Sequence, residues 1–198
     1  MSNWYKRHTS DQFVKKANKE GQRSRAAYKL LEIQNKRQII NKGSQVLDLG
    51  SAPGAWSETL VDIVGPQGIV VACDLLPMQP ISGVAFIQGD FLDTVTQENI
   101  QKEVAQFDVI VSDMAPNLTG QAVTDQANMY ELIENAMGFA EKHLKIDGVM
   151  LVKSFSGALQ NDVMVLFKSH FKTVKTVKPE ASRSGSKEIY LIGEGFKV

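Results

Sequence analysis

The stretch QVLDLGSAPGAWSETL, residues 45–60, decides the fold of this chain. The apolar run QVLDL is followed by a turn that holds two glycines and a proline, and a helical pattern begins directly after the turn. Gly50 and Gly54 remove side chains where a ligand would approach, and the backbone amides from Ala55 onward could donate hydrogen bonds to that ligand. The stretch therefore predicts a strand, a turn and a helix around a small charged ligand.

Alternating strand and helix patterns continue along the rest of the chain. Compact apolar runs predict strands at residues 45–49, 69–74, 84–88, 107–113 and 148–153, with a long helix at 125–144 before the last of them. Strand and helix in alternation predict an α/β fold, a parallel sheet with helices on both faces. A helix near 158–168 and two late strands, 171–179 and 188–193, predict an antiparallel pair at the sheet edge, and helices at 11–20 and 24–38 precede the sheet.

The length and composition predict one globular domain. The chain has 198 residues, of which 43% are hydrophobic, enough for one substantial core. We expect a single domain over residues 1–198, with a basic N-terminal helical segment at about 1–42 and a core at about 43–198. The single Cys73 cannot form an internal disulfide, and no apolar run approaches the roughly 20 residues of a membrane helix. We therefore expect a cytoplasmic protein with no membrane association.

The formal net charge of zero hides a separation of charge along the chain. Residues 1–42 hold 11 Lys and Arg against 3 Asp and Glu, residues 43–152 hold 3 against 15, and residues 153–198 hold 8 against 4. Such a split indicates that both ends of the chain meet a polyanion while the acidic middle faces a cation. Basic ends that are merely solvated remain the alternative.

Acidic residues follow the predicted strands, where open parallel sheets bind ligands. Asp74 ends the second strand and could accept hydrogen bonds from both hydroxyls of a ribose, and Asp90 could accept one from an adenine amino group. Both NAD and S-adenosylmethionine fit these features. The turn has the spacing G-x-x-x-G instead of G-x-G-x-x-G, and Asp48 beside it would repel a pyrophosphate but suits an ammonium and a sulfonium. The pattern therefore favours S-adenosylmethionine.

Lys153 closes a predicted buried strand, and an ammonium there needs a partner. Asp113, at the end of the preceding strand, is the candidate, and a structural ion pair is the plain alternative to a catalytic one. Lys29 and Glu188 are further candidates for the same cleft, although their spacing in the sequence does not show that they meet. Tyr190 is a candidate either for stacking on a base or for core packing.

Several blocks of the sequence together resemble a known family. These blocks are RSRAAYKLLEI, VLDLGSAPGAWS, ACDLLPM, QGDF, SDMAPN, GVMLVKSF and SRSGSKEIYLI, and they extend from about residue 10 to residue 193. The chain resembles the bacterial FtsJ-type heat-shock methyltransferases, which modify a ribose 2′-hydroxyl in 23S rRNA. The resemblance implies a Rossmann-like fold that uses S-adenosylmethionine, with a seven-stranded, mostly parallel sheet and helices on both faces.

The resemblance also implies roles for particular residues. Matched block by block, the catalytic residues are Lys29, Asp113, Lys153 and Glu188. The residues expected to bind the cofactor are Gly54, Trp56, Asp74, Asp90 and Asp113, to which the turn itself adds Gly50. No metal is expected. Ala55 stands where the family usually has a second glycine, and a helix start accepts alanine, so we expect little effect from this departure.

The expected substrate is a uridine of 23S rRNA, within the large ribosomal subunit, methylated by a monomeric enzyme. Arg23 and Arg25 in the basic segment and Arg183 in the late loop are expected to hold the RNA backbone. Three alternatives stay open. They are a relative that methylates tRNA, an NAD-dependent oxidoreductase and an RNA-binding module without catalysis.

Overall fold

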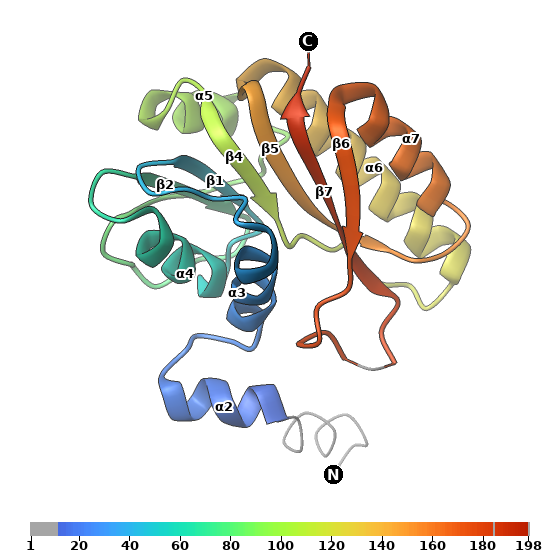
Figure 1. Cartoon of the computed structure of the whole chain (residues 1–198), viewed down its shortest axis with the longest axis horizontal. Coiled ribbons are helices and arrows are strands. Elements are labelled where there is room, and N and C mark those ends of the chain that lie inside the picture. The colour runs from blue at the N-terminus through green and yellow to red at the C-terminus, as the bar shows by residue number, and fades with distance from the viewer. Residues whose placement is uncertain (1–11, 184, 198) are drawn as a thin grey trace.

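The computed structural model describes residues 12–183 and 185–197, in which seven strands form one sheet in the order β3-β2-β1-β4-β5-β7-β6 (Figure 1). The strands are β1 (Gln45–Leu49), β2 (Ile69–Asp74), β3 (Val84–Gln88), β4 (Phe107–Ser112), β5 (Leu144–Phe155), β6 (Phe171–Val177) and β7 (Glu188–Phe196). Neighbours are parallel except β7, which runs antiparallel to both β5 and β6. The predicted seven-stranded, mostly parallel Rossmann-like sheet with a late antiparallel pair is confirmed.

The predicted helices are present with shifted ends, and the structure adds α5, which the sequence analysis did not predict. They are α2 (Gln12–Glu20), α3 (Ala26–Arg37), α4 (Ala55–Val64), α5 (Thr94–Glu103), α6 (Ala122–His143) and α7 (Gln160–His170). Helix α6 starts earlier than the predicted residue 125, because the Asp125 carboxylate sits inside the first turn and accepts hydrogen bonds from the Thr119 amide and hydroxyl. Residues 1–11, which include the start of the predicted basic segment and of its first helix, lie outside the described residues.

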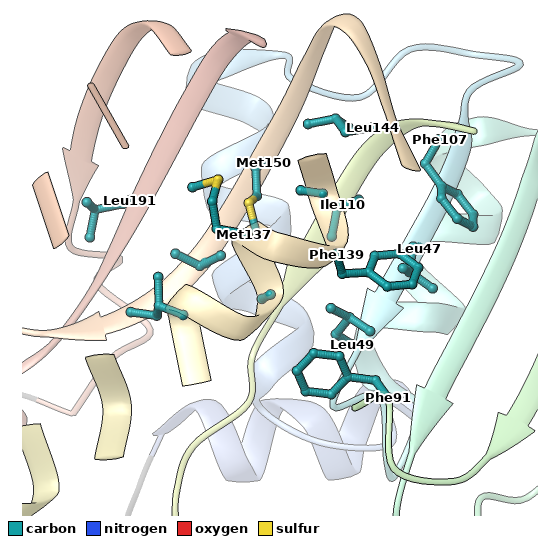
Figure 2. Close-up of a cluster of buried hydrophobic side chains, with 14 of the residues drawn as sticks. Leu47, Leu49, Phe91, Phe107, Ile110, Met137, Phe139, Leu144, Met150 and Leu191 are labelled. Carbon is teal, nitrogen blue, oxygen red and sulfur yellow. The ribbon is translucent and has the colours of Figure 1, made fainter. Parts of the chain in front are cut away.

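Strand residues alternate between two cores because successive side chains point to opposite faces of a sheet. Leu47, Leu49 and Ile110 pack with α5, α6 and α7 on one face (Figure 2). Val46 and Val111 pack on the other face with α3 and α4. Both faces are therefore covered, as the near-continuous apolar strands predicted.

The carboxyl ends of the parallel strands share one edge of the sheet. In Figure 1 this is the lower edge, toward which the arrow of β4 points, and α2 and the β6–β7 connection lie below it. Helix α3 stands beside the same edge and links α2 to the sheet. Among the helices described, none combines the length and the apolarity that a membrane span requires.

Candidate functional site

The strand order reverses between β1 and β4, so the turns that follow these two strands diverge and leave a place for a ligand. The turn after β1 needs both of its glycines. Gly50 has a φ of 75°, and a Cβ at this position would overlap the Met114 side chain. Gly54 has a φ of 100°, and its Cβ would lie 2.6 Å from Ile81 Cδ1 and 2.8 Å from Met78 Sδ. Both positions are therefore closed to L side chains.

Helix α4 begins at Ala55, immediately after this turn, so the amides of its first turn face the place where the ligand would lie. Ala55 is buried, and the residues other than glycine with positive φ are Gln38 and Asp147 among those described. Alanine is therefore unstrained at this position, as expected from a helix start.

Asp74 and Asp90 are held by backbone amides at the ends of β2 and β3. The Asp74 carboxylate accepts hydrogen bonds of 2.8 Å from the amides of Ala52 and Leu76, and Asp90 accepts one of 3.0 Å from Leu92. A carboxylate has about four lone-pair sites, so each of them can accept more bonds from a ligand. We call the turn 50–54 together with Asp74 and Asp90 the predicted donor site.

Asp48 lies beneath the turn instead of beside it. Its side chain is 0% exposed, the Ser57 hydroxyl donates a 2.6 Å hydrogen bond to Oδ2, and Oδ1 has no hydrogen-bond partner among the described residues. Burial raises the pKa of Asp48, and repulsion from Asp113 and Asp74 raises it further. The hydrogen bond from Ser57 lowers it in part, and the resulting pKa is about 7. A cation bound nearby would relieve this crowding, so the residues present fit the positively charged S-adenosylmethionine.

The Trp56 side chain joins two helices. Its indole N–H donates a 2.8 Å hydrogen bond to the Ala26 carbonyl of α3, and its ring packs 5.7 Å from that of Tyr190, centroid to centroid. The side chain is 3% exposed. Its backbone amide, in the first turn of α4, is therefore the part that can serve a cofactor.

The four predicted catalytic residues meet on one face of the sheet. Residues two apart in a strand point to the same face of the sheet. Lys153 is two residues from Leu151, and Glu188 is two residues from Tyr190; both Leu151 and Tyr190 pack on the α3 side. Asp113 is likewise two residues from Val111, which packs on that side. Lys29 reaches the group from α3. The Lys29 Nζ lies 2.7 Å from Glu188 Oε1 and 4.0 Å from Asp113 Oδ2, and the Lys153 Nζ lies 3.2 Å from Asp113 Oδ1. Lys153 also donates a 2.9 Å hydrogen bond to the Asp113 carbonyl.

Tyr190 is the member of this group that the sequence did not assign to it. Its hydroxyl donates a 2.6 Å hydrogen bond to Asp113 Oδ1 and accepts one of 3.2 Å from Lys29. The ring is fully buried, which excludes stacking on a base. Burial, with Asp113 and Glu188 nearby, raises the pKa of Tyr190 far above its usual range, so the phenol stays neutral. Its spacing of two residues from Glu188 in a strand was the available signal, since such residues share a face.

Charge balance keeps Glu188 ionised. Burial alone would raise the pKa of Glu188, but the charge and hydrogen bond of Lys29, the charge of Lys153 and a hydrogen bond from Ser182 together lower it. The Ser182 hydroxyl donates at 2.9 Å to the same Oε1 that faces Lys29. We call Lys29, Asp113, Lys153, Glu188 and Tyr190 the charged cluster.

The three predicted RNA-binding arginines have different surroundings. Arg25 donates a hydrogen bond from Nη2 to the Ala181 carbonyl, and burial together with the charge of Arg183 lowers the pKa of Arg25. Arg25 and Arg183 therefore lie near each other beside the β6–β7 connection. Arg23 instead donates three hydrogen bonds to the backbone around the donor site, at Pro53, Gln79 and Pro80.

Comparison with known proteins identifies the family of the chain. The family model described as FtsJ-like methyltransferase matches residues 22–196. A relative from Neisseria gonorrhoeae named Ribosomal RNA large subunit methyltransferase E is 49% identical over 193 residues, which cover 96% of this chain and 94% of the relative. A Plasmodium falciparum structure described as a ribosomal RNA methyltransferase has a TM-score of 0.79 at 30% identity, covering 88% of this chain and 98% of its own.

A more distant likeness concerns the fold alone. The structure of Aeropyrum pernix fibrillarin, solved with natively bound S-adenosyl-L-methionine, has a TM-score of 0.59 at 17% identity. The match covers 86% of this chain and 74% of that one. The same Rossmann-like arrangement of strands and helices is therefore shared by proteins of very different sequence.

Proposed function

Because the chain belongs to the FtsJ-like methyltransferase family, we propose that it transfers a methyl group from S-adenosylmethionine to the ribose 2′-hydroxyl of a uridine in 23S rRNA. The relatives named for the large-subunit rRNA favour this substrate over tRNA. The family excludes the NAD-dependent alternative, and an RNA-binding module without catalysis would leave the charged cluster without a use.

The observation that carries the proposal is the pairing of Lys153 with Asp113 at the carboxyl end of β4, the strand beside β1. Asp113 directly follows β4 and precedes Met114, whose side chain occupies the space that a Cβ on Gly50 would need. A lysine that can act on a hydroxyl thus lies on β5, which only β4 separates from β1 and the turn that would hold the donor. The donor, when bound, supplies an electrophilic methyl group on a sulfonium.

We assign Lys153 the role of taking the proton of the 2′-hydroxyl or of orienting its oxygen lone pair toward the methyl group. A hydroxyl is poorly acidic, so its proton needs an acceptor placed within hydrogen-bond reach. Asp113 orients Lys153 through its carboxylate and its carbonyl. Lys29, held by Glu188 at 2.7 Å, positions the ribose.

Asp74 and Asp90 would accept hydrogen bonds from the ribose and the adenine of the donor, and the amides at the start of α4 would face its methionine part. Asp113 would add negative charge close to the sulfonium. Arg25 and Arg183 would position the RNA backbone, a contact that carries no sequence information.

We further propose that the chain acts as one domain and as a monomer in the cytoplasm, with the assembled large subunit as its substrate. The single sheet with both faces covered supports one domain. Helix α2 and the β6–β7 connection, beside which Arg25 and Arg183 lie, are on the same edge of the sheet as the charged cluster, which suits a large polyanion.

The test is transfer of radiolabelled methyl from S-adenosylmethionine to isolated large subunits that lack the modification, with free 23S rRNA and bulk tRNA alongside. We expect label in 23S rRNA as 2′-O-methyl ribose, and none with Lys153→Ala at normal cofactor affinity. Label on tRNA alone would refute the proposal that 23S rRNA is the substrate. Full turnover by a folded Lys153→Ala would remove the lysine from its role, and donor binding without any transfer would leave an RNA-binding module.

A further inference from the structure

Arg23 lies in the short connection between α2 and α3, and its guanidinium faces the donor site. Its Nη1 donates hydrogen bonds to the carbonyls of Pro53 at 3.2 Å and Gln79 at 3.1 Å, and its Nη2 donates one to Pro80 at 3.1 Å. The Nε lies 4.0 Å from a carboxylate oxygen of Glu58 in α4.

These carbonyls belong to two different segments of the donor site. Pro53 lies in the glycine turn after β1, and Gln79 and Pro80 lie in the segment that follows β2 and Asp74. The same two segments touch at Gly54, where a Cβ would meet Met78 and Ile81. They are also joined by the bond from the Ala52 amide to Asp74. Arg23 therefore bridges both walls of the donor site from outside.

The chemistry of the bridge requires an arginine. The planar guanidinium presents five donors in a fixed fork, so one side chain can hold carbonyls from two segments at once, and charge-assisted hydrogen bonds are stronger than neutral ones. The aliphatic part also packs on the turn, since Arg23 Cδ lies 3.3 Å from the place of a Cβ on Gly54. Three of the five N–H donors of the guanidinium are thus used within the protein.

We propose that Arg23 is a positioning residue of the donor site, which fixes the glycine turn relative to the segment after Asp74 and so preorganises the pocket for S-adenosylmethionine. This role differs from the RNA contact that the sequence predicted for Arg23, and it rests on the proposed methyltransferase function. Arg23 stands just before α3, the helix that carries Lys29, so the bridge also ties the donor site to the start of that helix. The hydrogen bond from the Trp56 indole to Ala26 makes a second connection between α4 and α3.

The experiment compares the wild-type protein with Arg23→Gln and, as a matched loss of one exposed charge, Arg37→Gln at the end of α3. Calorimetry measures the Kd of S-adenosylmethionine without RNA, and steady-state methylation of large subunits gives KM and kcat. We expect Arg23→Gln to raise both the Kd and the KM for the donor about tenfold, or about 1.4 kcal/mol, with kcat at saturating donor within about twofold of wild type. Arg37→Gln should leave the donor Kd unchanged.

Two other results would overturn the proposal. An unchanged donor Kd together with weaker RNA binding would make Arg23 an RNA contact, and a lower kcat at an unchanged KM would mean that the side chain only maintains the amount of folded enzyme. If Arg23→Gln does not fold, as judged by circular dichroism, Arg23→Lys is measured by the same criteria, because it keeps the charge and the packing but cannot span three carbonyls. A wild-type protein that fails to bind the donor would instead refute the proposed function.

Discussion

The buried carboxyl of Asp48 predicts that the affinity for S-adenosylmethionine rises with pH. In the free protein burial raises the pKa of Asp48 to about 7, with repulsion from Asp113 and Asp74, so the group is largely protonated in mildly acidic solution. A ligand that carries positive charge at the neighbouring turn favours the ionised form. Binding must therefore release a proton wherever Asp48 is protonated in the free protein, and the affinity increases as the pH rises through that pKa.

The magnitude follows from linkage between binding and protonation. If Asp48 is ionised in the complex and has a pKa of about 7 in the free protein, the affinity increases about 25-fold between about pH 5.5 and pH 7.5. At pH 7 about half a proton is released for each ligand bound. The range stops at about pH 7.5 because the α-amino group of the ligand itself begins to titrate above it.

Isothermal titration calorimetry in two buffers with different ionisation enthalpies measures both the Kd and the protons released. Asp48→Asn cannot ionise and should lose most of the pH dependence, whereas Asp62→Asn, which changes an exposed carboxylate of the same helix that holds Ser57, should keep it. A wild-type Kd that is the same at both ends of the range, or an equal pH dependence in Asp48→Asn, would refute the reasoning.

Three further predictions concern the charged cluster and the core. Tyr190→Phe removes the hydrogen bond to Asp113 but keeps the ring, so turnover should fall about ten- to hundredfold with an unchanged circular dichroism spectrum; wild-type rates would contradict the role of the hydroxyl. Phe107→Ala empties a fully buried site on the α6 face and should lower the free energy of unfolding in urea by about 3–5 kcal/mol. The pKa of Glu188 is lower in the folded than in the unfolded chain, so its contribution to stability is present above the usual range for a glutamate and is lost as the pH falls through the folded pKa. Wild type should therefore lose more stability than Glu188→Gln between about pH 5 and pH 3, and equal losses would show that the pair with Lys29 adds nothing.

The sequence by itself determined the order and type of the elements except α5, which it did not predict. Apolar strand runs and helical periodicity are local signals, and they predicted β1 to β4 to within one residue at each end. Ends set by contacts from elsewhere were less well predicted. Strand β5 begins at Leu144, before the predicted residue 148, because Leu144 pairs with Phe107 ahead of a register shift.

The sequence also determined which residue types stand at the strand ends. Gly50, Asp74 and Asp113 follow apolar runs, and a parallel sheet brings such ends to one edge whatever the details of packing. Strand parity, a period of two, can be counted along the chain. It was therefore open to prediction that Glu188 and Tyr190 share a face.

Only the tertiary structure decided how the long polar side chains are used. Asp48 is buried beneath the turn. Arg23 bridges two segments that lie more than 25 residues away from it in the sequence. Tyr190 belongs to the charged cluster. A hydrogen bond between distant residues depends on the register of strands and the docking of α3, and neither is encoded in the local pattern. The charge of a residue shows that it needs a partner, and the packed chain decides whether that partner is a ligand or the protein itself.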